Sequence, residues 1–433
     1  MKYEWITSSP VAQWKKRGAP TPVDCVSTLK HLQSPRQTWK GFGGCFNELG
    51  WKAMGCLSSK DRDTVLRSLF SSTAGCGFNY CRLPIGASDY AESWYSHDEH
   101  PGDFTMKQFS IERDHKYLLP YIRAAVTFQP DLYLFASPWS PPTWLKQPQA
   151  YNNGKLIWKP EYLNAYALYF AKFVKAYAEA GIRIDAVHVQ NEPNSDQKFP
   201  SCLWTGEQMR DFIRDYLGPT FLKSKLDCQI WAGTIERADV NAWAQLILSD
   251  EKAREYITGV GYQWAGKGAV QRTRQAWPNL PMAQTENECG EGLNSRDYAH
   301  YIFDLFQHYI SNGVEAYVYW NMVLKDGGES TWGWKQNSMI SINTSKATFK
   351  YNPEFYVMKH FAAFVEPGSQ VLDLEGVWAA NAIAFRKPDG RIVYVIHNPF
   401  ATPSPVYLAG KTCTMRFVLD PGSLNTIITN TGK

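Results

Sequence analysis

The chain has 433 residues and a formal net charge of +4, and 15% of its residues are aromatic, including 17 tryptophans. This length suits a large barrel with a smaller module better than a single small domain. The positive charge is spread along the chain without a basic stripe, which argues against nucleic acid as the main partner. No apolar run approaches the roughly 20 residues that a membrane-spanning helix needs.

The cysteines and the N-terminal residues indicate the compartment. The nine cysteines are odd in number and have no metal-binding spacing such as C-x2-C, which fits a reducing environment. Residues 1–10 contain no apolar segment typical of a signal peptide. We therefore expect a cytoplasmic protein, or a secreted one if a leader has been removed.

The predicted elements begin with short polar and apolar alternations in residues 1–37, which Pro10, Pro20, Pro22 and Pro35 interrupt. Alternation of this kind is typical of β-strands. We predict one or two strands here, outside any barrel.

From Trp39 onward, apolar strands alternate with helical segments. Eight strands are predicted, at Trp39–Gly44, Phe78–Leu83, Leu132–Ser137, Ala186–Gln190, Gln229–Gly233, Gly259–Gln263, Pro281–Glu286 and Ala316–Trp320. The clearest helices are predicted at Glu161–Ala180, Asp297–Ser311 and Pro353–Phe364. Eight strands alternating with helices predict an α/β fold, a (β/α)8 TIM barrel over residues 38–365.

The remaining residues, 366–433, return to a period of two. Residues 382–385 and 392–396 read as a hairpin around the turn Pro388-Asp389-Gly390. We expect these strands to pair with the N-terminal ones, giving a side β-sandwich domain built from both chain ends.

Two glutamates stand at the predicted ends of barrel strands. Glu192 follows the strand that Pro193 terminates, and Glu286 ends the seventh strand. In a barrel of parallel strands, ligands bind at the C-terminal ends. Two carboxyl groups there, roughly 5 Å apart, are what a retaining glycosidase needs.

Several motifs give the sequence a resemblance to a known family. They are Lys40–Gly44 (KGFGG), Arg82–Asp89 (RLPIGASD), Ala136–Lys146 (ASPWSPPTWLK), Asn191-Glu192-Pro193, Thr285-Glu286 and Trp320-Asn321. Together, in this order and at predicted strand ends, they resemble glycoside hydrolase family 30, which includes the glucosylceramidases. The resemblance covers nearly the whole chain and implies a barrel with a side β-sandwich and retaining hydrolysis.

The resemblance implies roles for the residues around the scissile bond. Glu192 would be the general acid/base and Glu286 the nucleophile, and Asn191 would bind the sugar 2-hydroxyl. Arg82 matches a family arginine near the nucleophile, where a cation lowers the pKa of Glu286. Glu192 must instead stay protonated near neutral pH.

Four further residues match positions that hold the sugar. Asp89 and Trp139 match residues on the side of the 4- and 6-hydroxyls, and Trp320 matches a wall of the subsite. Asn337 is a further match, in a loop of different length.

The end of the sixth strand departs from the wider clan, which often has His-x-Tyr with the tyrosine bonded to the nucleophile. Here the residues are Tyr262-Gln263-Trp264. Either the Tyr262 hydroxyl or the Trp264 indole N–H would contact Glu286. Glu288 and Glu291 are rivals for the nucleophile, although Glu288 lies beyond the strand end.

The sequence thus predicts an exo-acting retaining β-glycosidase that acts on β-glucosides or a closely related β-sugar. The alternatives are an endo-β-1,6-glucanase, a β-xylosidase or a β-fucosidase of the same family. A non-catalytic carbohydrate-binding barrel would be expected to lose one of the two glutamates. A metal-dependent enzyme would need clustered ligands at the strand ends, where His188 is the only histidine. We expect no metal, no cofactor and a small carbohydrate or glycoside as partner; the sequence does not specify an oligomeric state.

Overall fold

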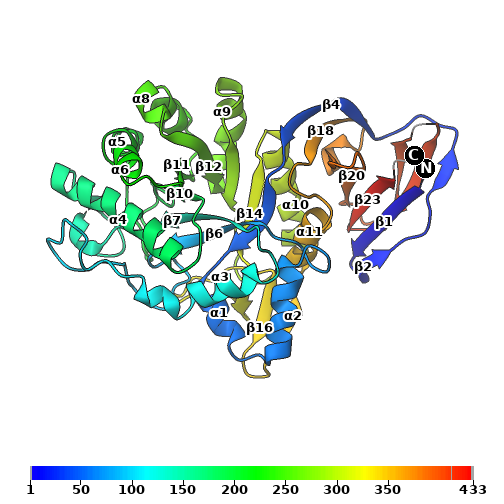
Figure 1. Cartoon of the computed structure of the whole chain (residues 1–433). Helices are drawn as coiled ribbons and strands as arrows, with labels where there is room; N and C mark the ends of the chain where they lie inside the picture. Colours follow the sequence, from blue (N-terminus) through cyan, green and yellow to red (C-terminus); the bar gives the residue numbers. More distant parts are fainter. Residues whose placement is uncertain (1, 411, 431–433) are drawn as a thin grey trace.

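Eight parallel strands close into a barrel in the computed structural model, which describes residues 2–410 and 412–430 (Figure 1). The strands in barrel order are β5 (Gly41–Cys45), β6 (Tyr80–Ile85), β7 (Tyr133–Pro138), β10 (Ala186–His188), β11 (Gln229–Ile235), β12 (Ile257–Gln263), β13 (Met282–Glu286) and β14 (Ala316–Asn321). Each predicted strand overlaps one of these eight. The predicted TIM barrel is therefore confirmed.

Helices surround the barrel and cover the apolar outer faces of the strands (Figure 1). The main ones are α2 (Ser59–Phe70), α3 (Leu118–Val126), α4 (Pro160–Glu179), α5 (Gly206–Phe212), α6 (Gly218–Lys223), α9 (Val270–Ala276), α10 (Arg296–Ser311) and α11 (Pro353–Ala362). α4 begins with Pro160 in its first turn and ends before Gly181, whose φ of 81° is easily adopted only by glycine. Backbone N–H groups of Gly181 and Ile182 donate to Ala178 and Tyr177, which satisfies the last carbonyls of the helix.

The interior of the barrel is apolar at one end and polar at the other. Apolar and aromatic side chains, including Tyr80, Phe135 and Trp231, fill the N-terminal end. Because side chains alternate along a strand, Arg82 and Ser137 point to the same interior, one layer nearer the C-terminal end. The polar layer supports the site described below.

Both chain ends form the second domain, a β-sandwich. Its larger sheet has the order β2-β1-β23-β20-β19-β18-β4, and its smaller sheet has the order β21-β22-β3. The strands are β1 (Lys2–Ser9), β2 (Ala12–Lys16), β3 (Thr21–Val23), β4 (Lys30–Thr38), β18 (Gln370–Glu375), β19 (Ala382–Arg386), β20 (Ile392–Asn398), β21 (Ser404–Ala409), β22 (Thr414–Leu419) and β23 (Ser423–Asn430). The prediction of one or two N-terminal strands was too low, because four form. The sandwich itself is confirmed, and both termini lie in it (Figure 1).

The sandwich and the barrel share a core. Phe385 and Val395 of the large sheet pack in the same apolar cluster as Phe361 of α11. His360, also on α11, is fully buried and bridges Thr426 and Ser8 at 2.9 Å each. The sandwich is therefore held against the barrel by both apolar packing and buried hydrogen bonds.

In the described part of the chain, no helix has both the length and the apolar character required to cross a membrane.

Candidate active site

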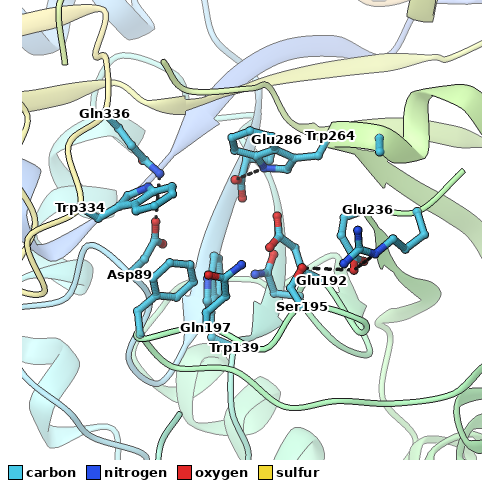
Figure 2. Close-up of a pocket in the computed structure, with 14 residues that line it drawn as sticks. Asp89, Trp139, Glu192, Ser195, Gln197, Glu236, Trp264, Glu286, Trp334 and Gln336 are labelled. Carbon is cyan, nitrogen blue, oxygen red and sulfur yellow. Dashed lines mark hydrogen bonds and ion pairs between the residues drawn. The ribbon is translucent and has the colours of Figure 1, made fainter. Parts of the chain in front are cut away.

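A cavity of about 300 Å³ opens at the C-terminal ends of the barrel strands, where the sequence predicts the site (Figure 2). Fourteen residues line it: Asp89, Trp139, Asn191, Glu192, Ser195, Gln197, Phe199, Glu236, Arg237, Trp264, Ala265, Glu286, Trp334 and Gln336. They come from the segments that follow six of the barrel strands and from the end of a seventh strand, β13.

Glu192 and Glu286 face one another across this cavity (Figure 2). The Nε2 of Gln263 donates to Glu192 Oε1 at 3.1 Å and to Glu286 Oε2 at 3.3 Å. Because one nitrogen contacts both oxygens, their separation cannot exceed the sum of these distances. A single bridging donor fits the close pair of a retaining glycosidase, in which no water has to be accommodated between the two groups.

The Glu286 carboxylate is held by donors on both oxygens. Arg82, which is fully buried, forms an ion pair with Oε2 at 3.0 Å, and the indole N–H of Trp264 donates to Oε1 at 3.1 Å. Burial raises the pKa of Glu286, whereas Arg82 acts in the opposite direction. The predicted lowering by Arg82 is therefore present, but burial outweighs it.

Glu192 lies in different surroundings. Burial raises the pKa of its carboxyl group, and the Arg82 guanidinium contacts Glu286 rather than Glu192. Glu286 accepts from Arg82, Gln263 and Trp264, whereas Glu192 accepts from Gln263, so the direct donors favour the anion more at Glu286 than at Glu192. This division is the one that a nucleophile and an acid require.

The backbone at Glu192 and Trp264 is unusual. Their φ angles are 45° and 47°, in the left-handed region that non-glycine residues rarely adopt. Backbone strain of this kind persists where surrounding contacts impose it and is common at functional sites. Here it directs both side chains into the same cavity.

Asn191 is oriented by three donors. Its Oδ1 accepts from Arg82 at 2.6 Å, from Thr234 Oγ1 at 3.2 Å and from Gln263 Nε2 at 3.2 Å. With its oxygen occupied in this way, its Nδ2 is left to donate. The amide can therefore bind a sugar hydroxyl beside the two carboxyls.

Asp89 lies across the cavity from the Glu192 side (Figure 2). Its Oδ2 accepts from Gln336 Nε2 at 3.4 Å, and Gln336 Oε1 accepts from Asn321 at 2.8 Å. Burial and, next, the charge of Glu192 raise the pKa of Asp89 to about 7. Trp139 forms the adjoining wall, and Trp320 packs behind it with ring centroids 5.2 Å apart.

Arg82 and Trp320 both lie beneath the cavity surface. Each side chain is fully buried, and the Arg82 guanidinium is 4.6 Å from the Trp139 ring centroid and 5.4 Å from that of Trp320. Arg82 thus lies beside the nucleophile candidate, as the sequence analysis expects. Trp320, expected to form a wall of the subsite, supports that wall from behind and does not line the cavity.

Two predicted site residues are not brought to the cavity. The Tyr262 side chain is fully buried and its hydroxyl contacts Thr273 Oγ1 on α9 at 2.6 Å, so it points away from Glu286. Asn337 is buried and donates to Glu354 at 2.7 Å, and its neighbour Gln336 lines the cavity instead. Of the two alternatives for the contact with Glu286, the structure shows the Trp264 indole N–H and not the Tyr262 hydroxyl. Asn337, expected at a position that holds the sugar, does not line the cavity.

Glu288 and Glu291, the two rival nucleophiles, do not line the cavity, and Glu288 has other partners. It forms an ion pair with Lys267 and accepts from the Tyr301 hydroxyl at 2.7 Å.

Sequence reasoning also missed residues that the structure brings to the site. Gln263, which bridges the two carboxyls, had no predicted role and was named only as the residue between Tyr262 and Trp264. Glu236 directly follows β11, so its place after a barrel strand was an available signal. Trp334 and Gln336 lie in a long loop after β14, where the sequence carries no comparable signal.

A TIM barrel whose strand ends bring two carboxyls this close together has the arrangement of a retaining glycosidase. The comparisons with known proteins place it more narrowly. The model of the glycosyl hydrolase family 30 TIM-barrel domain matches residues 39–365. The chain belongs to this family.

Individual relatives agree with that placement. The lysosomal acid glucosylceramidase of Mus musculus is 30% identical over 415 residues, covering 89% of this chain and 80% of the relative. The endo-1,6-beta-D-glucanase of Neurospora crassa is 27% identical over 401 residues, covering 87% and 82%. The crystal structure of SrfJ from Salmonella typhimurium superposes with a TM-score of 0.92 at 24% identity and covers all of both chains. That structure supports the fold.

Proposed function

We propose that the enzyme removes a terminal β-linked glucose from small glycosides, with Glu286 as the nucleophile and Glu192 as the acid/base. The observation that carries the proposal is the pair of carboxyls bridged by Gln263 in a small cavity. At about 300 Å³, the cavity is at the low end for ligand pockets, which run from roughly 300 to 1,000 Å³. Nearly buried side chains, among them Asp89 and Gln336, form part of its wall. A cavity of this kind suits one terminal sugar better than the middle of a chain.

The arrangement supports a double displacement. Glu286 would attack the anomeric carbon while Glu192 protonates the leaving oxygen, which forms a glycosyl-enzyme. Glu192, then a carboxylate, would take a proton from water as it hydrolyses that intermediate. Asn191 would donate to the sugar 2-hydroxyl, a bond that strengthens in the transition state.

The test is a panel of nitrophenyl β-glycosides, comprising the glucoside, galactoside, xyloside and fucoside. We expect the highest kcat/KM for the glucoside and a product of retained β configuration by NMR. A product of inverted configuration would contradict the mechanism, and a strong preference for the xyloside or fucoside would move the proposal to that sugar.

Endo-β-1,6-glucanase activity is the second candidate. It is favoured by the name of the Neurospora crassa relative and by aromatic rings near the cavity. Trp94, which is partly exposed, has its ring centroid 4.9 Å from that of Trp332, and Trp332 is two residues from Trp334 of the cavity. Such rings can stack on further sugars of a chain. Release of oligosaccharides from a β-1,6-glucan, rather than glucose alone, would favour this activity.

We also propose that the enzyme works in the cytoplasm, on small imported glycosides. All nine cysteines lie within the described residues and have free thiols, and Cys25, Cys56 and Cys413 are exposed. Free exposed thiols are compatible with a reducing compartment. Fractionation of the source cells, followed by activity assays of each fraction, tests this location.

A further inference from the structure

Glu236 is a third carboxyl group in the cavity, and the mechanism above does not use it. It directly follows β11, which pairs with β10, the strand that leads to Glu192. Its side chain is only 4% exposed, yet it lines the cavity. Figure 2 places it on the far side of Glu192 from Asp89.

One oxygen of this carboxyl group is fully engaged by the protein. Oε1 accepts from the backbone N–H of Asn194 at 3.1 Å and from the Ser195 hydroxyl at 3.2 Å, and it pairs with Arg237 Nε at 3.3 Å. Asn194 and Ser195 belong to the turn that follows Glu192. These contacts fix the orientation of the Glu236 side chain relative to Glu192.

The other oxygen is buried and has no hydrogen-bond partner among the residues that the structure describes. A buried carboxylate oxygen without a donor is costly. Because Oε1 holds the side chain in place, Oε2 cannot readily turn to another protein donor. A donor supplied by the substrate would satisfy it.

The position of Glu192 decides which part of the substrate that donor belongs to. The acid contacts the glycosidic oxygen, so the glycone lies on its Asp89 side and the leaving group on its Glu236 side. We propose that Glu236 Oε2 accepts a hydrogen bond from a hydroxyl of the leaving group, so that the site selects β-glycosides whose leaving group is itself a sugar. This inference rests on the proposed function and narrows its substrate class to β-linked disaccharides and short oligosaccharides.

A different role for Glu236 would act through charge. Burial and, next, the charge of Glu192 raise the pKa of Glu236 to about 7, so the two carboxyls influence one another. If Glu236 served only to tune Glu192, its replacement would change the cleavage of every substrate that needs an acid. The two roles therefore differ in their dependence on the leaving group.

The experiment compares two glucosides whose leaving alcohols are similarly basic, a β-1,6-linked glucose disaccharide and an n-octyl β-glucoside. Both need the acid, but only the disaccharide offers leaving-group hydroxyls. In Glu236→Gln, we expect the ratio of kcat/KM for the disaccharide to that for the octyl glucoside to fall about 10- to 100-fold, as for a lost hydrogen bond to a charged group. The matched control is Glu255→Gln, which removes the same charge from an exposed position outside the cavity and should keep the wild-type ratio.

Equal losses on both glucosides, together with an alkaline limb of the pH profile shifted by the same amount for both, would overturn the inference in favour of charge tuning. A second measurement needs only the wild-type enzyme. With nitrophenyl β-glucoside as donor, glucose should be a better glycosyl acceptor than 1-butanol at equal concentration, and lack of such a preference would also overturn the inference.

Failure of the proposed function gives a different result. A wild-type enzyme that cleaves no β-glucoside contradicts the function, and the ratio is then measured with disaccharide and octyl glycosides of the sugar that it does cleave. A wild-type enzyme that cleaves β-glucosides while Glu236→Gln keeps the wild-type ratio contradicts the inference alone.

Discussion

Replacement of Trp264 by phenylalanine tests the electrostatic support of the nucleophile. The change keeps an aromatic ring but removes the indole N–H that donates to Glu286 Oε1 at 3.1 Å. A hydrogen bond to a charged group contributes about 1.5–3 kcal/mol, and 1.36 kcal/mol corresponds to one pKa unit. Since Arg82 and Gln263 still donate to Oε2, we take the lower end and expect the pKa of Glu286 to rise by about one unit.

The acidic limb of the kcat/KM profile reports the ionisation of the nucleophile in the free enzyme. This limb should move to higher pH by about one unit in Trp264→Phe, because a carboxylate that has lost a donor holds its proton more tightly. The profile is measured with nitrophenyl β-glucoside between pH 4 and 9.

Tyr262→Phe is the matched control. It removes a hydroxyl two residues away that contacts Thr273 outside the barrel, so its acidic limb should stay at the wild-type pH. An unshifted limb in Trp264→Phe, or an equal shift in Tyr262→Phe, would refute this account of the site.

Four further predictions concern the catalytic pair, metals and the domain interface. Glu286→Gln should abolish turnover with a wild-type melting temperature, and full activity in this variant would remove Glu286 from the nucleophile role. Glu192→Ala should slow alkyl glucosides far more than nitrophenyl glucosides, and azide should restore turnover with a β-glucosyl azide as product; equal losses without an azide effect would place the acid elsewhere. Activity should survive exhaustive EDTA dialysis, since two carboxyls suffice for the chemistry, and recovery that depends on one divalent ion would contradict this. Burial lowers the pKa of His360 to about 3 from 6.5, so the unfolded chain binds the extra proton and this residue makes stability fall as pH drops from 6.5 towards 3. In His360→Gln the unfolding free energy should therefore depend less steeply on pH, by up to about 1.4 kcal/mol per pH unit. Urea denaturation at pH 6.5, 5.5 and 4.5 measures this dependence, and an identical slope of unfolding free energy against pH in both proteins would contradict the prediction.

The sequence by itself determined the barrel, the sandwich and the place of the two glutamates. Strand and helix periods are local properties, and eight alternations leave few topologies to choose from. The rule that ligands bind at the C-terminal ends of barrel strands then places Glu192 and Glu286 together, although 94 positions separate them in the numbering. None of these steps requires knowledge of a side-chain contact.

Only the tertiary structure decided which side chains reach the reacting atoms. At the end of β12 the register with β13 shifts between Tyr262 and Gln263, and the φ of 47° at Trp264 turns the chain again. Simple strand alternation therefore fails there, which is why the choice between Tyr262 and Trp264 stayed open and the bridging role of Gln263 was missed. In the loop after β14, the choice of Gln336 over Asn337 depends on distant partners, Asp89 for one and Glu354 for the other. Contacts between residues far apart in sequence fix these orientations, and a local pattern carries no information about them.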